Sequence, residues 1–289
     1  MRLVRYKAAN GTRLGVVRDD TVVDVWAGHA DAPGDLGTLL RRDPNALAEV
    51  AELAKRASGA DGIPLAGINY AIPVESPGKV VCLGLNYSDH LAESTHEAPK
   101  FPILFMRGTT SLIAHGEPMI RPSASETLDY EAELALVIGR KMRHVTPEQA
   151  LHGVAGYTCF NDGSVREYQR HTIQWTMGKN FDGTGGFGPV FVTADELPPG
   201  ASGLKIETRV NGEVRQSNNT GNMTFNVADS ISYMSRGMTL EPGDVIAMGT
   251  CSGIAAAFKP PKWLRAGDVV EVEIEGIGVL RNTVADEKL

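Results

Sequence analysis

The chain has 289 residues, 42% of them hydrophobic and 22% charged, an ordinary composition for a globular protein. Its formal net charge of −7 argues against a nucleic-acid partner, because such a surface needs a basic stripe. No apolar run reaches the length of about 18 residues that a membrane span requires, so we expect no membrane partner. The first residues lack the apolar core of a signal peptide. Three widely separated cysteines without a CxxC pair favour a reducing compartment, and we expect the cytoplasm.

The N-terminal part predicts a small α+β unit. Residues 3–25 are typical of two or three short strands, with an Asn-Gly turn signal at 10–11. An Asp-Pro pair at 43–44 then predicts the start of a helix that continues through 45–57.

Residues 58–78 are rich in Gly and Pro and predict a linker. We therefore place a domain boundary near residue 75. This gives a small cap domain with its linker over 1–74 and a larger domain over 75–289.

The larger domain is predicted to be mostly β, which makes the fold class α+β with β dominant. Apolar runs predict strands over 79–85, 102–106, 133–139, 153–161, 188–193, 204–215, 244–250 and 268–282. Two helices interrupt this pattern, near 146–152 and near 226–236.

Residues 183–188 read GTGGFG and match the GxGxxG pattern of dinucleotide-binding proteins. That motif works only between a strand and the N-terminus of a helix, where the helix dipole meets the pyrophosphate. Here Pro189 and another apolar run follow, which predict a strand. We therefore expect no dinucleotide site.

Acidic residues occupy every second position at the start of one predicted strand: Asp129, Glu131 and Glu133. Alternate side chains of a strand share a face, so these carboxylates mark either a solvated face or a metal site. The chain contains its own control, because VVEVEIEG carries the same alternation at Glu271, Glu273 and Glu275 and is typical of a strand with one wet face. Periodicity alone therefore does not decide between the two interpretations.

The next predicted strand ends on Asp162, a candidate third ligand beside Glu131 and Glu133. Further polar residues follow closely, namely Arg166, Gln169, His171 and Lys179. Close carboxylates repel by about 4 kcal/mol per pair at an effective dielectric of 20, so such a cluster needs protons or a cation. Ligands that are all oxygen select Mg²⁺, Mn²⁺ or Ca²⁺ over zinc.

A second group of polar residues lies in GLNYSDHLAES, after a predicted strand. A short helix here would place His90 and Glu93 on one face. A carboxylate beside an imidazole fixes its tautomer and raises its basicity, which suits a general base. Spacing alone favours the alternative, a surface helix with an incidental His–Glu pair.

Several separated motifs resemble the fumarylacetoacetate hydrolase family. In chain order they are LNYSDHLAE, DYEAELALVIG, GYTCFND, GKNFD, LEPGDVIAMGTCSG and LRAGDVVEVEIEGIGVLRN. The likeness covers about residues 75–289, and the N-terminal part is similar to the small cap domain of bacterial members. It implies a mixed β-sandwich roll and a homodimer.

The resemblance also implies a divalent metal held by Glu131, Glu133 and Asp162. Mg²⁺ or Mn²⁺ is expected there, and Ca²⁺ is the third choice. Asp129 is not expected to be a ligand; it either lies beside the ligands or is solvated.

Carried over in the same way, His90 and Glu93 form a base dyad on a mobile lid, and Lys179 is a polarising cation. The pocket groups that bind a small anionic keto acid are Arg166, Gln169 and Thr250. One segment departs from the family pattern: FDGTGGFGP stands where many members have FDTFGPxGP, so the loop beside the substrate differs.

The segment SVREYQRHTIQWTMGKNFDGTG is most similar to acylpyruvate or fumarylpyruvate hydrolases and related isomerases. The expected activity is metal-dependent cleavage of the C–C bond of a 2,4-diketo acid, an acylpyruvate such as fumarylpyruvate, to pyruvate and a carboxylic acid. The alternative is a decarboxylase or an isomerase (tautomerase) of an oxaloacetate-like or hydroxymuconate-like acid in aromatic catabolism. A third interpretation is a β scaffold whose metal has only a structural role.

Overall fold

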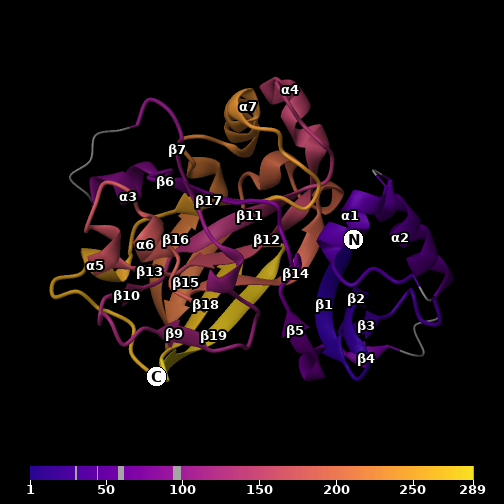
Figure 1. Ribbon diagram of the computed structural model, residues 1–289, viewed down its shortest axis with the longest axis horizontal. Helices are drawn as coiled ribbons and strands as arrows, with labels where there is room; N and C mark the ends of the chain where they lie inside the picture. The colour runs from indigo at the N-terminus through magenta and orange to yellow at the C-terminus, as the bar shows by residue number, and fades with distance from the viewer. Residues whose placement is uncertain (30, 44, 58–61, 94–98, 289) are drawn as a thin grey trace.

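The computed structural model describes residues 1–29, 31–43, 45–57, 62–93 and 99–288 (Figure 1). The chain begins with an antiparallel meander of β1 (Arg2–Ala8), β2 (Gly11–Arg18) and β3 (Thr21–Val23). Gly11 has a φ of 109°, the conformation that the predicted Asn-Gly turn requires. The three predicted N-terminal strands are confirmed.

Two helices cover this meander, α1 (Leu36–Arg42) and α2 (Ala46–Arg56). The predicted helix is confirmed as α2, but its N-cap is Asn45, whereas the predicted cap residue Asp43 is the C-cap of α1. Position 44 lies outside the described residues. The sequence analysis missed α1, which begins where the Asp35 side chain accepts a hydrogen bond of 2.7 Å from Thr38 N.

The predicted linker is partly wrong, because its described part contains two strands. β4 (Ile63–Pro64) pairs with β3, and β5 (Asn69–Ala71) pairs with β1. β5 forms because one edge of β1 is only partly paired by a strand of the larger domain. That strand pairs with residues 2–4 of β1, and without β5 the backbone groups of residues 5–7 on this edge would have no partner. Positions 58–61 lie outside the described residues.

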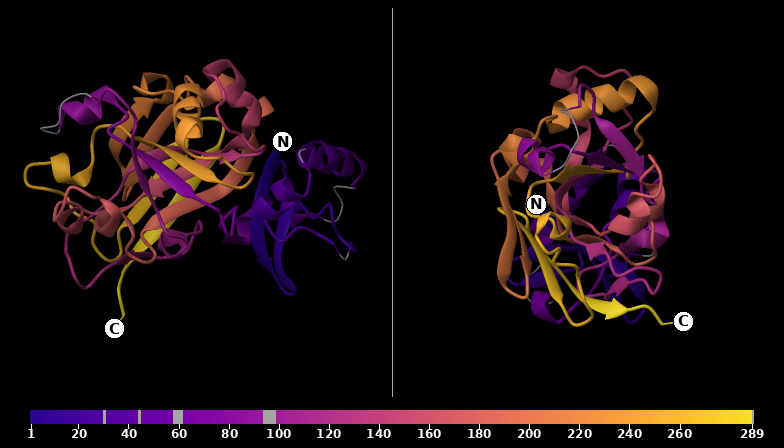
Figure 2. Two further views of the ribbon diagram at one scale, coloured as in Figure 1. Left: turned by 45° about the horizontal axis from the view of Figure 1, so that its top comes forward. Right: turned by 90° about the vertical axis from the view of Figure 1, so that its left-hand side faces the viewer.

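One large mixed sheet runs through the molecule in the order β4-β3-β2-β1-β14-β12-β11-β17-β6-β7. Its remaining strands are β14 (Gly185–Thr193), β12 (Val154–Asp162), β11 (Ala132–Ile138), β17 (Val245–Thr250), β6 (Val80–Gly84) and β7 (Ile103–Met106), and off this path β8 (Leu112–Ile113), which pairs with β14. The N-terminal unit forms one side of the molecule, where β1 pairs with β14 (Figures 1 and 2). Because the sheet is continuous across residue 75, the division into a cap domain and a catalytic domain stays a prediction.

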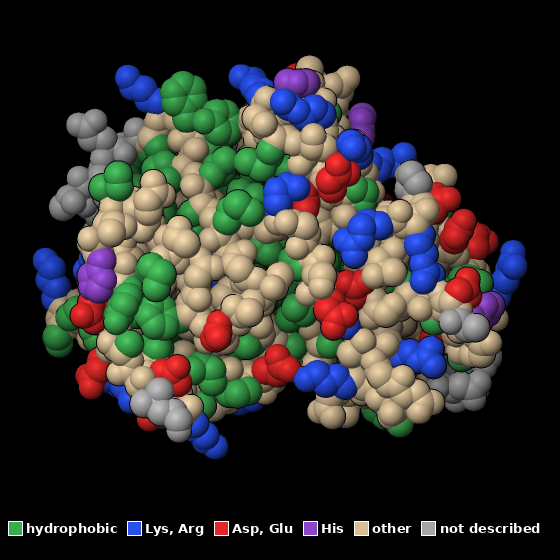
Figure 3. Space-filling view, in the orientation of Figure 1, with side chains coloured by type: hydrophobic (Ala, Val, Ile, Leu, Met, Phe, Trp, Pro, Cys, Tyr) green, Lys and Arg blue, Asp and Glu red, His purple; other side chains and the backbone are tan. Residues whose placement is uncertain are grey.

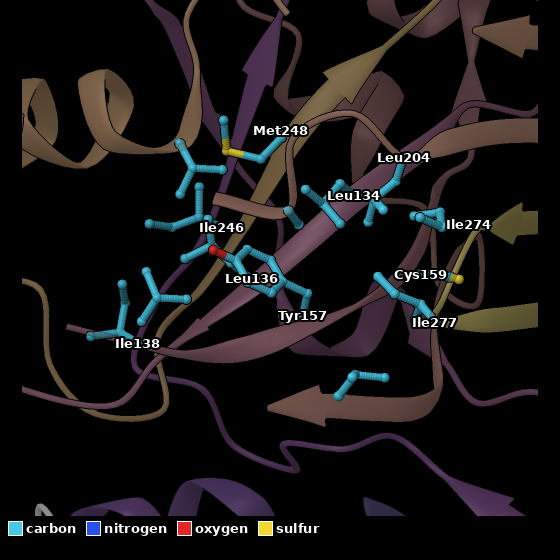
Figure 4. Close-up of a cluster of buried hydrophobic side chains, with 14 of the residues drawn as sticks. Leu134, Leu136, Ile138, Tyr157, Cys159, Leu204, Ile246, Met248, Ile274 and Ile277 are labelled. Carbon is cyan, nitrogen blue, oxygen red and sulfur yellow. The ribbon is translucent and has the colours of Figure 1, made fainter. Parts of the chain in front are cut away.

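A second sheet packs on the first in the order β16-β15-β18-β19-β9. Its strands are β16 (Glu213–Asn219), β15 (Lys205–Val210), β18 (Val269–Ile274), β19 (Gly278–Asp286) and β9 (Met119–Arg121). Leu134 and Leu136 of β11 and Ile274 of β18 belong to one buried core cluster that draws residues from both sheets (Figure 4). The predicted mixed β-sandwich is therefore confirmed, and burial of its apolar faces stabilises it.

The two predicted helices of the large domain are also present, as α4 (Pro147–Ala150) and α7 (Val227–Gly237), and they pack on each other. The GTGGFG segment enters the buried strand β14, as expected, and no helix of the described residues begins directly after it. Glu271 and Glu273 of the control strand lie at its half-exposed positions and pair with Arg209.

No helix in the described part of the chain is both long and apolar enough to cross a membrane. On the face shown in Figure 3, charged side chains of both signs are interspersed, and the described residues form no continuous basic stripe there. The absence of a nucleic-acid partner stays a prediction.

Candidate active site

Three buried carboxylates meet where β11 begins and β12 ends. The two strands are antiparallel, with Ala132 opposite Asn161, so the start of β11 lies beside the end of β12. Glu131, Glu133 and Asp162 each offer a carboxylate oxygen, and these oxygens lie within 4.8 Å of one another. Their residues are at most 4% exposed. The alternation at 129–133 therefore marks a buried acidic cluster, and the interpretation as a solvated face is wrong.

Buried cations surround two of these carboxylates. Lys179 Nζ lies 2.7 Å from Glu131 Oε2 and 2.6 Å from Asp162 Oδ2. Arg166 Nη2 lies 2.6 Å from Glu131 Oε1, and Arg107 Nη1 lies 2.5 Å from Asp162 Oδ1. Lys179 closes the short helix α6 (Thr176–Lys179), and Arg166 opens α5 (Arg166–Gln169).

Glu133 has a different environment. Its Oε2 accepts a hydrogen bond of 2.9 Å from Gly249 N, and the described residues give it no ion pair. Burial, followed by the charges of Asp162 and Glu131, raises the pKa of Glu133 well above its ordinary value. Burial also acts to raise the pKa of Glu131, but Lys179 and Arg166 outweigh it and lower that pKa to about 2.

These residues fit a divalent metal. Three convergent carboxylates form an all-oxygen donor set, which suits Mg²⁺ or Mn²⁺ and also Ca²⁺. The carboxylate of Glu133 lacks the cation that its two neighbours have, and a bound metal would supply that charge. The predicted ligand set is thus brought together at one point by the fold.

The predicted base dyad lies on α3 (Ser88–Ala92) and the residue that follows it. His90 Nδ1 lies 3.4 Å from Glu93 Oε2, and Glu93 Oε1 accepts a hydrogen bond of 2.9 Å from Gly253 N. Asp89 accepts a hydrogen bond of 2.7 Å from Ser252 Oγ, which fixes the helix to the loop after β17. Residues 94–98 lie outside the described residues, and the mobility of this lid stays a prediction.

The predicted pocket groups also converge. Arg166 Nη1 donates to Gln169 Oε1 at 2.9 Å, and Arg166 Nε donates to Asp129 Oδ2 at 2.8 Å. Asp129 is fully buried. The prediction that it lies beside the metal ligands is therefore confirmed, and the alternative prediction that it is solvated is wrong. Thr250 lies opposite Glu133 where β17 pairs with β11.

A cavity of about 660 Å³ joins these groups. Its polar lining residues include His90, Glu131, Glu133, Arg166, Gln169, Lys179 and Thr250. Its apolar lining residues include Leu83, Leu85, Ile103, Phe105, Trp175 and Ile254. Asp162 and Glu93 do not themselves line the cavity. His171 is exposed, stacks against Tyr168 at 4.7 Å between ring centroids, and does not line the cavity.

The sequence analysis missed two buried residues that hold the site. Arg107 directly follows the apolar run 102–106 and donates to Asp162 Oδ1 and Thr184 Oγ1. Its place at a strand end was the available signal. Gln216 donates to Thr250 Oγ1 at 2.8 Å from the second sheet. A lone glutamine in a polar strand carried no signal in the sequence.

Comparison with known proteins identifies the family of this chain. The family model "Fumarylacetoacetate (FAA) hydrolase C-terminal" matches residues 79–285. The chain is 38% identical to the mitochondrial oxaloacetate tautomerase Fahd2a of Rattus norvegicus over 293 aligned positions, covering 98% of this chain and 91% of that protein.

Two solved structures share the whole fold. The fumarylacetoacetate hydrolase of the psychrophilic Exiguobacterium antarcticum is 37% identical, with a TM-score of 0.85 over 99% of this chain and 100% of that one. The maleylpyruvate hydrolase of Sphingobium sp. SYK-6, in complex with manganese(II) ion and pyruvate, is 27% identical, with a TM-score of 0.82 over 100% of both chains. The family model matches most of the chain, and the similar proteins match almost all of it. This chain therefore belongs to the fumarylacetoacetate hydrolase family, whose members are enzymes that act as hydrolases or isomerases.

Proposed function

We propose that the chain is a divalent-metal-dependent enzyme that interconverts the keto and enol forms of 2-keto acids with a second carbonyl group at C4, such as oxaloacetate. The observation that carries this proposal is the position of His90 in the same cavity as the acidic cluster and Lys179. Tautomerisation needs one base beside an activated keto group, which this arrangement supplies. The oxaloacetate tautomerase similar over 98% of the chain supports it further.

The three carboxylates would hold the metal, and a bound divalent cation would draw electron density from the 2-keto oxygen and favour the enolate. The chain itself offers three hydrogen-bond donors to the substrate. Lys179 has three N–H bonds and uses two for Glu131 and Asp162, which leaves one. The Thr250 oxygen accepts from Gln216, so its hydroxyl hydrogen is free to donate.

Gln169 provides the third donor, because its oxygen accepts from Arg166 and its amide nitrogen still has two hydrogens. Arg166 donates hydrogen bonds to Asp129 and Gln169 and forms an ion pair with Glu131. We therefore assign Arg166 the role of orienting Gln169 and Glu131 and adding positive charge that attracts an anionic acid. Direct contact of Arg166 with the substrate stays a prediction.

His90 would carry the proton. In its neutral form, Nδ1–H directed at Glu93 leaves the lone pair on Nε2, which removes a proton from C3 of the keto acid. The electron pair of the C–H bond moves into the C2–C3 bond, and the 2-oxygen becomes an enolate oxygen. Return of the proton from His90 to that oxygen gives the enol, and the reverse steps give the ketone.

The test is a tautomerisation assay with oxaloacetate enol, followed by the loss of its absorbance. Protein stripped of metal should match the rate in buffer alone, and Mg²⁺ or Mn²⁺ should restore activity. His90→Ala should remove most of the restored rate. A metal-restored protein that does not exceed the buffer rate, or a fully active His90→Ala variant, would contradict the proposal.

The predicted hydrolysis of acylpyruvates becomes the second candidate, and the apolar lining of the cavity favours it. Oxaloacetate has no apolar group that could contact such a wall, whereas an acylpyruvate has its acyl chain. Metal-dependent release of pyruvate and acetate from acetylpyruvate would establish hydrolysis. Release of carbon dioxide from oxaloacetate would identify the decarboxylase instead. A metal that only raises the melting temperature would support the scaffold interpretation. The homodimer, the role in aromatic catabolism and the cytoplasmic location stay predictions.

A further inference from the structure

Two aromatic rings lead away from the acidic cluster along the cavity wall. Lys179 Nζ lies 5.0 Å from the centroid of the Phe105 ring. Phe105 in turn meets Trp175 edge to face, with ring centroids 5.6 Å apart and an interplanar angle of 68°. Successive contacts therefore link the ammonium group beside the carboxylates to Phe105 and Phe105 to Trp175.

The position of the indole is fixed from two sides. Lys179 N donates a backbone hydrogen bond of 3.2 Å to Trp175 O, so α6 sets the spacing between these two residues. A Cβ at Gly84 would lie 2.1 Å from the benzene ring of Trp175. The indole thus occupies the space that any side chain at the end of β6 would fill, and the glycine permits this contact.

A four-carbon acid does not use this part of the wall. With its carboxylate and 2-keto oxygen beside Glu131, Glu133 and Lys179, such an acid would have no chain atom beyond C4 left for the rest of the cavity wall. The half-buried Trp175 contacts Phe105 and lines the same cavity together with Leu83, Leu85 and Ile103. Atoms beyond C4 of a longer acid would reach it, and apolar atoms would lose water on contact with these side chains.

We propose that Trp175 is the specificity-determining residue of this enzyme and selects 2-keto acids whose chain beyond C4 is apolar. Gly84 and Phe105 act as positioning residues for the indole. This inference rests on the proposed function, because it places the keto-acid end of the substrate at the acidic cluster. It adds the chemical class of the group beyond C4, an alkyl or alkenyl chain.

The experiment measures binding of unreactive acids to the Mg²⁺-loaded protein by tryptophan fluorescence and calorimetry. The probes are 2-oxobutanoate, 2-oxohexanoate and 2-oxooctanoate, with 2-oxoadipate as the dicarboxylate of matched length. In the unsubstituted protein, affinity should rise by up to about fourfold per methylene group past C4, the gain expected for a buried CH₂. Affinity for 2-oxohexanoate should exceed that for 2-oxoadipate.

Trp175→Ala should lose most of this chain-length dependence and change the affinity for 2-oxobutanoate by less than about twofold. Trp175→Phe should keep part of it. Met177→Ala is the matched control, because Met177 lies on α6, which begins directly after Trp175, is 61% exposed and does not line the cavity. Gly84→Ala should weaken binding of the long acids in the unsubstituted protein and have no further effect in Trp175→Ala, since its Cβ acts by displacing the indole.

Three outcomes would overturn the inference. Trp175→Ala could retain the chain-length dependence, or it could lose affinity for 2-oxobutanoate and 2-oxooctanoate equally. In the unsubstituted protein, 2-oxoadipate could bind more tightly than 2-oxohexanoate. Circular dichroism of each variant separates these results from misfolding. The oxaloacetate assay tests the proposed function independently. Loss of chain-length selectivity in Trp175→Ala, in a protein that fails to tautomerise oxaloacetate, would support the subsite and reject the proposed function.

Discussion

Gln216 Nε2 donates a hydrogen bond of 2.8 Å to Thr250 Oγ1, and this contact joins the second sheet to the active-site edge of the first. The same amide nitrogen donates to Cys251 O, while Gln216 Oε1 accepts from Ala132 N at 2.9 Å and from Thr208 Oγ1 at 2.7 Å. Gln216 is 1% exposed. One buried amide therefore holds both β11 and β17 where they carry Glu133 and Thr250.

Replacing Gln216 by leucine should lower the free energy of unfolding by about 2 kcal/mol or more, because it leaves buried donors and acceptors without partners. Chemical denaturation measures this directly. Gln149→Leu is the matched control: it removes an exposed capping contact to Thr146 N and should cost about 1 kcal/mol or less. Equal effects of the two substitutions would contradict the role given to Gln216.

Lys179→Met should destabilise the metal-free protein by about 3–5 kcal/mol, because it removes the cation shared by Glu131 and Asp162 and leaves their charges buried. Mg²⁺ or Mn²⁺ should therefore raise the melting temperature of this variant more than that of the unsubstituted protein. Calorimetric melting with and without metal measures both effects. Lys55→Met, at a side chain 71% exposed, should change stability by less than about 0.5 kcal/mol. A metal-free Lys179→Met protein as stable as the unsubstituted one would rule out the shared-cation role.

Glu133→Gln should make the metal-free protein relatively more stable as pH rises. The raised pKa of Glu133 means that the folded state holds its proton above the pH at which the unfolded chain releases it. Its stabilising contribution is therefore complete below the unfolded-state pKa of about 4.5 and is lost as pH rises through the folded-state pKa. The amide removes that loss. Denaturation from about pH 5 to about pH 9 measures the difference.

Glu131→Gln should behave in the opposite way. The pKa of Glu131 is lowered to about 2, so its contribution is present above about 4.5 and is lost as pH falls towards about 2. This variant should be destabilised at neutral pH, and the difference should shrink in acid. The two variants serve as controls for each other, because they remove one carboxylate each from one cluster. The same pH dependence of stability in both variants would contradict the assignment of different electrostatic environments to Glu131 and Glu133.

His90→Ala should lower kcat by about 10²–10⁴-fold and leave metal affinity unchanged, because His90 lines the cavity and is not part of the carboxylate cluster. Glu93→Gln should have a smaller effect on kcat, since the amide can still contact Nδ1. Enzyme kinetics and a metal titration by calorimetry separate the two properties. His171→Ala changes an exposed histidine and should be neutral. Loss of metal binding in His90→Ala would place this residue in the metal site instead.

Short local patterns were enough to predict most of the strands and one half of the candidate site. β11 and β12 are mostly apolar and buried along their whole length, and the carboxylates at their ends are visible in the sequence. Helix α1 was missed because seven residues are too few for a clear helical period, and β4 and β5 were missed because Gly and Pro surround them. Strands of two or three residues exist only where a neighbouring strand offers hydrogen bonds.

By itself, the sequence determined which residues form the two central strands, where the carboxylates lie along them, and that His90 and Glu93 are one helical turn apart. Only the tertiary structure decided how these charges are balanced. Lys179 reaches Glu131 across 48 positions, Arg107 reaches Asp162 across 55, and Gln216 reaches Ala132 across 84. No local periodicity encodes such contacts. A charge or amide that is buried without a partner costs too much free energy, so the folded chain must bring a partner from a distant part of the sequence.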